Sequence, residues 1–235
     1  MMAEETHFPL GLEEGADGGF VVHALSVPGC TTTAESRDAA LAAFPAELSE
    51  WLQFLAAIGE RVPAPDAELE LAIDEWVETD AEIAEGESRS IFDADFVPLS
   101  DLDVQRYVWW LGELRGRLLR RIRPLSPAEQ DEPRADGWSV ARLADELARA
   151  QWWTLSRLGS SPLGEVPDRT TGRLDTAMAL VVQRFTEMPA EARGTIVELD
   201  GETWTPRKVL RRLLALEWEM GRVVERLLAS VESAR

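Results

Sequence analysis

The chain has 235 residues, of which 45% are hydrophobic and 29% charged, and its formal net charge is −19. This length and composition fit one or two compact domains and exclude a disordered chain. No apolar stretch approaches the ~20 residues that cross a bilayer. The acidic start lacks the apolar segment of a secretory signal. We therefore expect a cytoplasmic protein that does not span a membrane.

The N-terminal part, residues 1–80, predicts a small acidic α/β module. Turns rich in glycine at 15–19 and 28–29 separate short runs of β-branched and aromatic residues, which predict three strands. Ser36 is a favourable N-cap for a helix that carries apolar residues at 3/4 spacing and ends at Gly59. Pro45 is expected to kink this helix. Residues 69–74 alternate in polarity and predict a further strand.

This module resembles a known family. It carries the runs DGGFVVHALSVPGCTTTAES and WLQFLAAIGERVP, which are similar to the HicB-like antitoxin module over about residues 7–75. In that family the module masks a small RNA-cleaving toxin. The resemblance therefore implies a comparable fold, with a small basic toxin as the partner. The DNA-binding appendage that many such antitoxins carry is not apparent in this sequence.

Residues 81–98 are predicted as an extended linker whose phenylalanines anchor to the following domain, and residues 99–235 as an up-down four-helix bundle. Each helix carries one apolar face. Ser100 or Asp101 is a favourable cap for the first of them, Ser139 for the second, and Thr205 with Pro206 at the first helical position forms a strong start for the last. The helices are expected at about 101–123, 140–158, 171–188 and from 206 onward. Together the two parts predict an α+β fold.

The bundle resembles a second family. It carries the runs GWSVARLADELARAQWWTLSRL and WTPRKVLRRLLALEWEMGRVVERLL, which look like the second and fourth helices of DinB-like proteins, within about residues 99–231. Such proteins hold a divalent metal with three histidines. The resemblance places those positions at Glu146, Leu216 and Met220, with Glu217 retained between the last two. A leucine and a methionine are poor replacements for imidazole, so the resemblance implies a degenerate metal site.

The ligand-pocket candidates are therefore Glu146, Leu216, Glu217, Met220 and Arg212. Leu216 and Met220 are interpreted as filling the core. They lie on a predicted inner stripe of the last helix, formed by Leu213, Leu216, Met220, Val223 and Leu227. The two carboxylates are expected to pair with Arg211 or Arg212. Bundle metal centres usually recruit three or more ligands, so we expect no metal to bind there.

Other residues of the types that act in catalysis or bind metals, cysteine and histidine above all, are scarce. Cys30 is the single cysteine, and His7 and His23 are the only histidines. One cysteine cannot form an intramolecular disulfide or a cysteine-based zinc site. His23, on a predicted strand, is interpreted as structural. No usable Ser/His/Asp set, phosphate-binding glycine loop or Cys/His pair is present, so no catalytic residue, metal or cofactor is predicted.

The negative charge is concentrated in the first part of the chain. Residues 1–98 contain 22 acidic and three basic residues, whereas residues 99–235 contain 21 of each. This asymmetry favours a boundary near residue 98. It also disfavours a nucleic-acid partner, since such binding depends on lysine and arginine. An acidic surface suits a basic protein partner, and it serves solubility equally well.

Three functions follow from these observations. The first is a non-enzymatic binding or scaffold protein with an unknown protein or small-molecule partner, and a homodimer is compatible with it. The second is a residual thiol-dependent transferase or isomerase of the DinB-like type, with Glu146 or Glu217 as general base. The third is an antitoxin-like regulator of a small basic RNA-cleaving toxin. The missing metal ligands favour the first.

Overall fold

The computed structural model describes residues 6–134, 137–159 and 169–232. The chain divides into two compact units. The N-terminal unit contains the residues up to Val97 together with 200–203, and the helical unit contains the other residues from Pro98 onward. The fold is α+β, a small four-stranded sheet with one helix followed by a helical part, which confirms the predicted class at this level. Within the described ranges, no helix is both long and apolar enough to cross a membrane.

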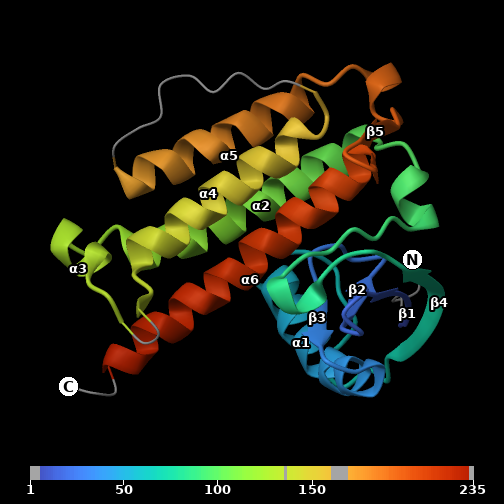
Figure 1. Cartoon of the computed structure of the whole chain (residues 1–235), viewed down its shortest axis with the longest axis horizontal. Coiled ribbons are helices and arrows are strands. Elements are labelled where there is room, and N and C mark those ends of the chain that lie inside the picture. The colour runs from blue at the N-terminus through green and yellow to red at the C-terminus, as the bar shows by residue number, and fades with distance from the viewer. Residues whose placement is uncertain (1–5, 135–136, 160–168, 233–235) are drawn as a thin grey trace. The chain divides into compact units, whose positions relative to one another are not determined.

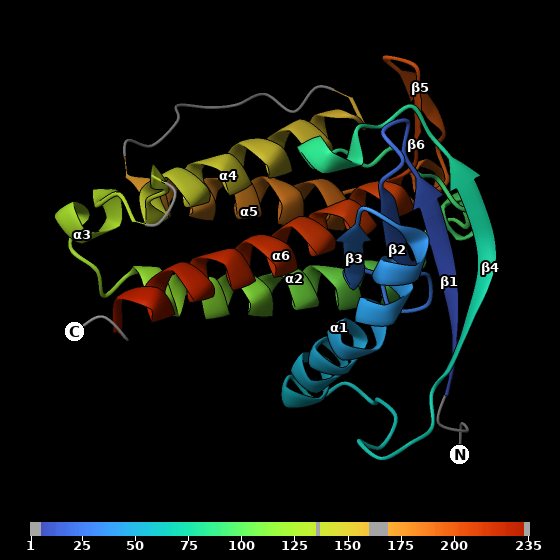
Figure 2. The same ribbon diagram turned by 60° about the horizontal axis from the view of Figure 1, so that its bottom comes forward.

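The N-terminal unit is built on a sheet with the strand order β3–β2–β1–β4. Neighbouring strands are antiparallel, except that β4 lies parallel to β1 at one edge (Figure 2). The register between these two strands shifts after Leu10, which leaves Asp74 as an extra residue in β4. The strands are β1 (His7–Glu14), β2 (Phe20–Ala24), β3 (Thr31–Ala34) and β4 (Glu70–Glu78).

Helix α1 (Arg37–Ala57) forms the crossover between β3 and β4 and packs on β2 and β3. Its start agrees with the sequence prediction, because the Ser36 Oγ accepts a hydrogen bond from the Ala39 backbone N–H at 3.3 Å. The segment remains one helix through Pro45, where a kink is expected. Its buried face is the predicted apolar one and includes Phe44, Leu48, Trp51, Leu52 and Leu55.

Residues 81–98 were predicted as a linker, but 81–97 form part of the N-terminal unit. Phe92 is buried, and its ring meets the His23 ring edge-on at a centroid distance of 5.2 Å. A side chain at Gly11 would collide with the same ring. The expectation that the phenylalanines of this segment anchor to the bundle is therefore wrong for Phe92. Two short 3-10 helices lie in the segment, Ile83–Glu85 and Asp93–Phe96.

The helical unit contains four long helices that lie side by side (Figure 1). Helices α2 and α4 each contact both α5 and α6. Hydroxyl side chains cap three of the four, as the sequence predicts, since Ser100, Ser139 and Thr205 each accept a hydrogen bond from a first-turn N–H. The helices are α2 (Asp101–Ile122), α4 (Val140–Ser156), α5 (Thr170–Thr186) and α6 (Pro206–Glu232).

The direction of these helices corrects the predicted up-down arrangement. Arg173 in the first turn of α5 pairs with Asp145 in the first half of α4. At the other ends, Arg184 of α5 donates to the carbonyl of Leu158, just past α4. Helices α4 and α5 are therefore parallel, and α2 and α6 run together in the opposite direction (Figure 1). The chain order is thus up, down, down, up.

Two small elements were not predicted. Helix α3 (Pro127–Asp131) begins with a capping box between Ser126 and Glu129. Strands β5 (Val197–Leu199) and β6 (Glu202–Trp204) form a hairpin. Its two turn residues, Asp200 and Gly201, have positive φ angles of 56° and 77°. The Asp-Gly pair is a common signal for such a turn, so the sequence did carry the information for this hairpin.

Candidate functional site

A buried polar cluster joins the four long helices of the helical unit. Each helix contributes one group: the Arg115 side chain from α2, the Gln151 side chain from α4, the Leu174 carbonyl from α5 and the Glu217 side chain from α6. The candidate Glu217 is thus present in the core, but its partners are residues that the sequence analysis did not select. We call Arg115, Gln151 and Glu217 the core network.

The core network is closed by short hydrogen bonds. The Arg115 guanidinium binds Glu217 through two parallel bonds, Nε to Oε1 at 2.7 Å and Nη2 to Oε2 at 2.9 Å. Gln151 accepts from Arg115 Nη2 at 2.6 Å and donates to Glu217 Oε2 at 2.5 Å. The remaining Arg115 nitrogen, Nη1, donates to the carbonyl of Leu174. Both carboxylate oxygens and all three guanidinium nitrogens are therefore engaged.

The core network is also buried. The exposed fractions of Arg115, Gln151 and Glu217 are 3%, 1% and 1%. The cavity that Glu217 lines has a volume of about 10 Å³, which is at most the space of one water molecule. The pair carries no net charge, and each charge is satisfied by its neighbours. This arrangement leaves Glu217 neither room nor a free oxygen with which to act on a substrate.

The second carboxylate candidate lies elsewhere. Glu146 is partly exposed on α4, and its Oε1 is 3.3 Å from Nη1 of Arg149 on the same helix. The two side chains are 43% and 71% exposed, so this ion pair contributes little stability. The prediction that both carboxylates pair with Arg211 or Arg212 is therefore wrong. Glu217 binds Arg115, and Glu146 binds Arg149.

The two apolar candidates, Leu216 and Met220, are half-buried and pack against the edge of the core. The predicted inner stripe of α6 is displaced. Leu213 is buried as expected, but Leu216, Met220, Val223 and Leu227 are only partly covered. The fully buried face of α6 instead passes through Leu210, Leu213, Leu214, Glu217, Trp218, Val224 and Leu228. Glu217 thus lies near the middle of the buried face.

The last candidate, Arg212, belongs to an aromatic cluster. Its guanidinium carbon lies 5.3 Å from the ring centroid of Trp204 and 5.8 Å from that of Trp153. The two tryptophan rings meet edge-on at 5.6 Å. Cation–π contacts of this kind orient a side chain. Arg212 is therefore oriented by a tryptophan of α4, Trp153, and one at the end of β6, Trp204.

The residues at the implied metal positions do not fit a metal ion. Glu146 faces its own helix neighbour, Leu216 and Met220 offer a hydrocarbon chain and a thioether, and Glu217 is held by a guanidinium that would repel a cation. Among the residues that the structure describes, no group of three or more His, Cys, Asp and Glu side chains is arranged to hold one.

The N-terminal unit has a buried polar cluster of its own around Glu13. This carboxylate is inaccessible to solvent and accepts hydrogen bonds from Ser88 Oγ at 2.6 Å and from the Arg89 and Ser90 backbone N–H groups at 2.7 and 3.0 Å. Thr79 Oγ1 adds a fourth at 3.0 Å. The carboxylate therefore ties residues 88–90 to strand β1, which explains why the predicted linker belongs to this unit.

His23 completes the Glu13 cluster. Its Nε2 lies 3.5 Å from Glu13 Oε2 and 3.4 Å from Ser90 Oγ. Burial by itself raises the pKa of the Glu13 carboxyl, but hydrogen bonding to His23, the charge of His23 and the bonds from Ser88 and Arg89 hold that pKa well below its usual range. A catalytic triad needs serine and carboxylate on opposite ring nitrogens. Here both approach the same nitrogen, Nε2, so Ser90 and Glu13 do not form that arrangement with His23.

Comparison of the chain with protein-family models, with curated proteins and with solved structures finds no match. The HicB-like and DinB-like resemblances therefore stay predictions from the sequence. What the structure adds is a class of protein: a two-unit α+β chain with a closed polar network in the core of its helical unit.

Proposed function

We propose that the chain is a non-enzymatic binding or scaffold protein, in which a HicB-like acidic module is joined to a DinB-like bundle that has lost its metal site. The helical unit serves as a packed body, and the acidic module engages a basic partner. The main support for this proposal is that the core network has no reactive group left unbonded. Where a bundle enzyme would hold reactive groups, Arg115, Gln151 and Glu217 satisfy one another.

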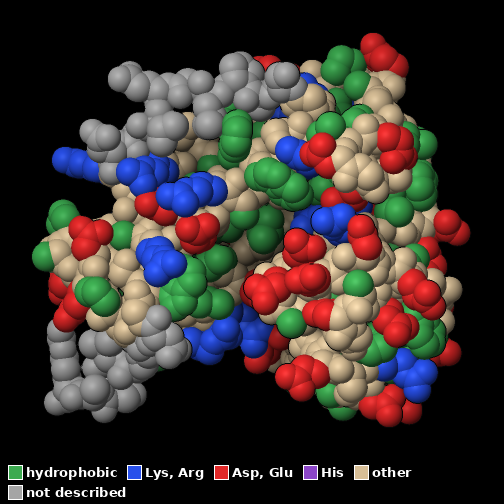
Figure 3. All heavy atoms as spheres, in the orientation of Figure 1, with side chains coloured by type: hydrophobic (Ala, Val, Ile, Leu, Met, Phe, Trp, Pro, Cys, Tyr) green, Lys and Arg blue, Asp and Glu red, His purple; other side chains and the backbone are tan. Residues whose placement is uncertain are grey.

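The charge distribution supports the binding role of the N-terminal unit. Acidic side chains crowd its surface in Figure 3, whereas basic side chains are grouped on the helices. Residues 1–98 hold 22 acidic but only three basic residues. Such a surface attracts a basic protein and accelerates its association at low ionic strength. A small basic toxin, as the HicB-like resemblance implies, is one partner with this chemistry.

Two observations weigh against a residual transferase or isomerase. A general base must reach the proton that it abstracts, and Glu217 is enclosed with both oxygens bonded to protein. Glu146 is accessible, but it is a half-exposed carboxylate paired along its own helix. Glu217 therefore has no space for a substrate beside it, and Glu146 lacks the burial that makes a carboxylate an effective base.

Metal analysis of the full-length protein tests the proposal. We expect the purified protein to contain no stoichiometric transition metal, and its melting temperature to stay unchanged when Zn²⁺, Ni²⁺ or Mn²⁺ is added, because a ligand stabilises a protein only if it binds the folded state. The matched control is the triple variant Glu146→His, Leu216→His, Met220→His. If the DinB-like resemblance is correct, this variant should bind one Zn²⁺ and melt at a higher temperature.

The outcomes are distinct. One tightly held metal ion in the natural protein would overturn the proposal of a non-catalytic helical unit. Failure of the histidine variant to bind zinc, in a protein that remains folded by circular dichroism, would instead count against the DinB-like resemblance.

A further inference from the structure

Strand β4 forms an open edge of the sheet in the N-terminal unit. In the described parts of the chain it pairs with β1 on one side and with no strand on the other (Figure 2). The backbone N–H groups of Glu70 and Thr79 donate to carbonyl groups in and just before β1, at 2.9 Å each. Because successive residues of a strand direct these groups to opposite sides, those of Leu71 and Glu78 point to the open side. This side of β4 can therefore pair with a further strand.

An uncovered apolar row lies along the open edge. Ile73 lies beside Leu10 of β1 in the sheet register, and Trp76 lies beside Leu12. Both leucines are buried, at 2% and 0%, but Ile73 and Trp76 are 42% and 50% exposed. Helix α1 packs on β2 and β3, and the guanidinium carbon of Arg37 at its start lies 5.8 Å from the ring centroid of Trp76. The face that α1 covers over the inner strands is therefore open at β4.

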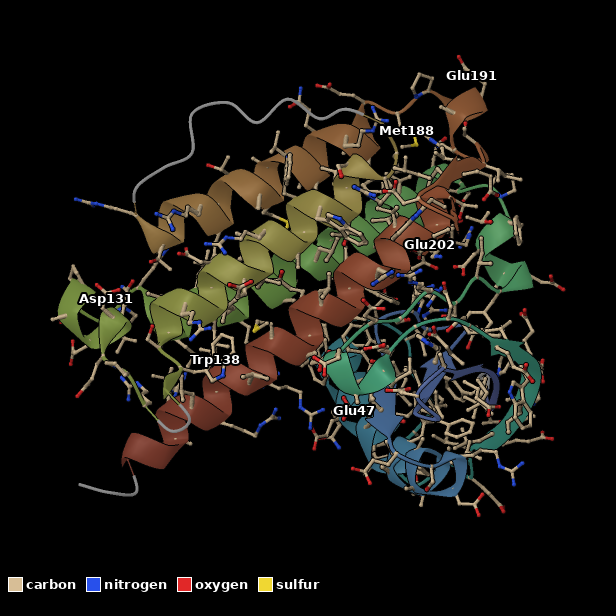
Figure 4. All side chains as sticks on the ribbon, viewed as in Figure 1. Glu47, Asp131, Trp138, Met188, Glu191 and Glu202 are labelled. Atoms are coloured by element: carbon tan, nitrogen blue, oxygen red, sulfur yellow. The ribbon has the colours of Figure 1, made fainter. Side chains whose placement is uncertain are left out.

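The open edge is also strongly acidic. Of the 13 residues from 68 to 80, six are acidic and none is basic. Glu70, Asp74 and Glu78 of the strand are exposed, and oxygen-tipped side chains project outward from this edge of the sheet in Figure 4. A strand that alternates apolar residues with lysine or arginine would cover the apolar row and lie against these carboxylates.

The same charges disfavour a second copy of this chain as the occupant. Two β4 strands paired edge to edge would bring the acidic side chains of one copy opposite those of the other, and like charges in that position destabilise a sheet. The extra residue Asp74 adds a local irregularity that also limits indiscriminate pairing. A strand of opposite charge meets no such repulsion.

We propose that β4 is the docking site for an extended basic segment of a partner protein, which adds to the sheet as a further strand. The backbone of the segment pairs with the open side of β4. Its apolar side chains cover Ile73 and Trp76, and its lysines or arginines lie against the carboxylates. The inference rests on the proposed function, because it names the surface through which the acidic module engages a basic partner.

A labelled peptide that alternates lysine and valine, with the nine-residue length of β4, serves as the probe. Its fluorescence anisotropy reports binding to the full-length protein. Wild type should bind it at low ionic strength and release it as salt is added. The same peptide with every backbone nitrogen methylated keeps its charge but has no N–H donor for a sheet, and it should bind at least about 10-fold more weakly.

The variant Ile73→Thr, Trp76→Thr tests the apolar row. It should bind the peptide at least about 10-fold more weakly, because an aromatic anchor is lost. Threonine favours strands, so the sheet should be retained. The matched control Ile196→Thr, Trp109→Thr removes the same side chains from the helical unit, where they are 55% and 41% exposed. It should bind within about 2-fold of wild type.

The variant Glu70→Gln, Glu78→Gln tests the charges of the edge. It should bind about 3-fold or more weakly at low ionic strength, since two exposed ion pairs with the peptide are lost. The control Glu35→Gln, Glu85→Gln removes equal charge from exposed positions elsewhere in the N-terminal unit. Its affinity should stay within about 2-fold of wild type.

Three results would overturn the strand site: no binding by wild type, equal losses in the edge variants and their controls, or undiminished binding of the methylated peptide. A wild-type dimer that Ile73→Thr, Trp76→Thr dissociates would assign the edge to a second copy instead. If the peptide binds with equal losses throughout, the basic partner of the proposed function keeps its support while this edge loses its role. The metal analysis tests the helical unit separately, so the two failures are distinguishable.

Discussion

The two units each bury a glutamate completely, and they stabilise it in different ways. Glu13 of the N-terminal unit is surrounded by hydroxyl and backbone N–H donors from residues 79–90, with His23 alongside. Glu217 of the helical unit is bound by one guanidinium and one amide. The first carboxylate organises an irregular segment that has no sheet partners of its own. The second joins regular helices whose backbones are already satisfied.

This difference predicts different responses to mutation. A charge pair between regular helices can be replaced, together with its polar side-chain neighbour, by apolar residues, because the helix backbones form their own hydrogen bonds. A carboxylate that satisfies several backbone donors has no apolar equivalent, because its removal leaves those donors buried without an acceptor.

The largest effect is expected from Arg115→Met. It leaves the Glu217 carboxylate buried without its counter-charge, and we expect a loss of about 3–5 kcal/mol in unfolding free energy, measured by urea denaturation. The control is Arg117→Met on the same helix. Arg117 forms the same two-bond contact with Glu225, at 2.8 Å for each bond, but the side chains are 43% and 30% exposed. Its loss should cost at most about 1 kcal/mol.

The replacement of the whole core network sharpens that result. The triple variant Arg115→Met, Gln151→Leu, Glu217→Leu removes both charges of the network. Its unfolding free energy should therefore return to that of wild type or exceed it by about 1–4 kcal/mol. A triple variant as unstable as Arg115→Met alone would show that apolar residues cannot replace the core network.

A smaller loss is expected from Glu13→Gln. The amide has the size of the carboxylate but offers one acceptor oxygen to a cluster of donors, which should cost about 1.5–3 kcal/mol. Amide hydrogen exchange should accelerate at Arg89 and Ser90, whose backbone N–H groups donate to the Glu13 carboxylate in the wild type. The neighbouring variant Glu14→Gln lies outside this cluster and should change stability by less than about 0.5 kcal/mol. Unchanged exchange in Glu13→Gln would contradict the assigned role.

The smallest effect appears only in acid. The Glu13 pKa is lower in the folded protein than its ordinary value of 4.5. Its ionised form therefore contributes stability that is complete above that value and is lost as the pH falls toward the folded pKa. The difference in unfolding free energy between wild type and Glu13→Gln should therefore shrink as the pH falls below about 4.5. A difference independent of pH would show that Glu13 is not the group that titrates.

Local signals in the sequence identified most of the regular elements. Ser36, Ser100, Ser139 and Thr205 cap the helices that they were expected to begin. The apolar stripes of α1, α2, α4 and α5 were recognised because each follows one clear 3/4 pattern. Helix α3 and the β5–β6 hairpin carry equally local signals, the capping box at Ser126 and the Asp-Gly turn at Asp200.

Helix α6 shows where local signals are insufficient. More than one of its faces is apolar, and the pattern alone favoured the stripe without a charge. The structure turns Glu217 inward because Arg115, 102 residues earlier in the chain, supplies its counter-charge. The candidate site was predicted in part for this reason: Glu217 was selected, but neither Arg115 nor Gln151 carries a sequence signal that marks it as the partner.

The sequence by itself determined the α+β class, the strand and helix order of the first module, most helix starts and the charge asymmetry, because each depends on neighbours within a few turns of the chain. Tertiary structure alone decided that residues 81–97 fold onto the sheet, that α4 and α5 run parallel, and which partner each buried carboxylate takes. Glu13 meets Ser88 across 75 residues and Glu217 meets Arg115 across 102, whereas the direction of α5 depends on contacts 28 and 26 residues apart that join its two ends to α4. Two groups that are distant in the sequence can pair in the core only after the fold has brought them together.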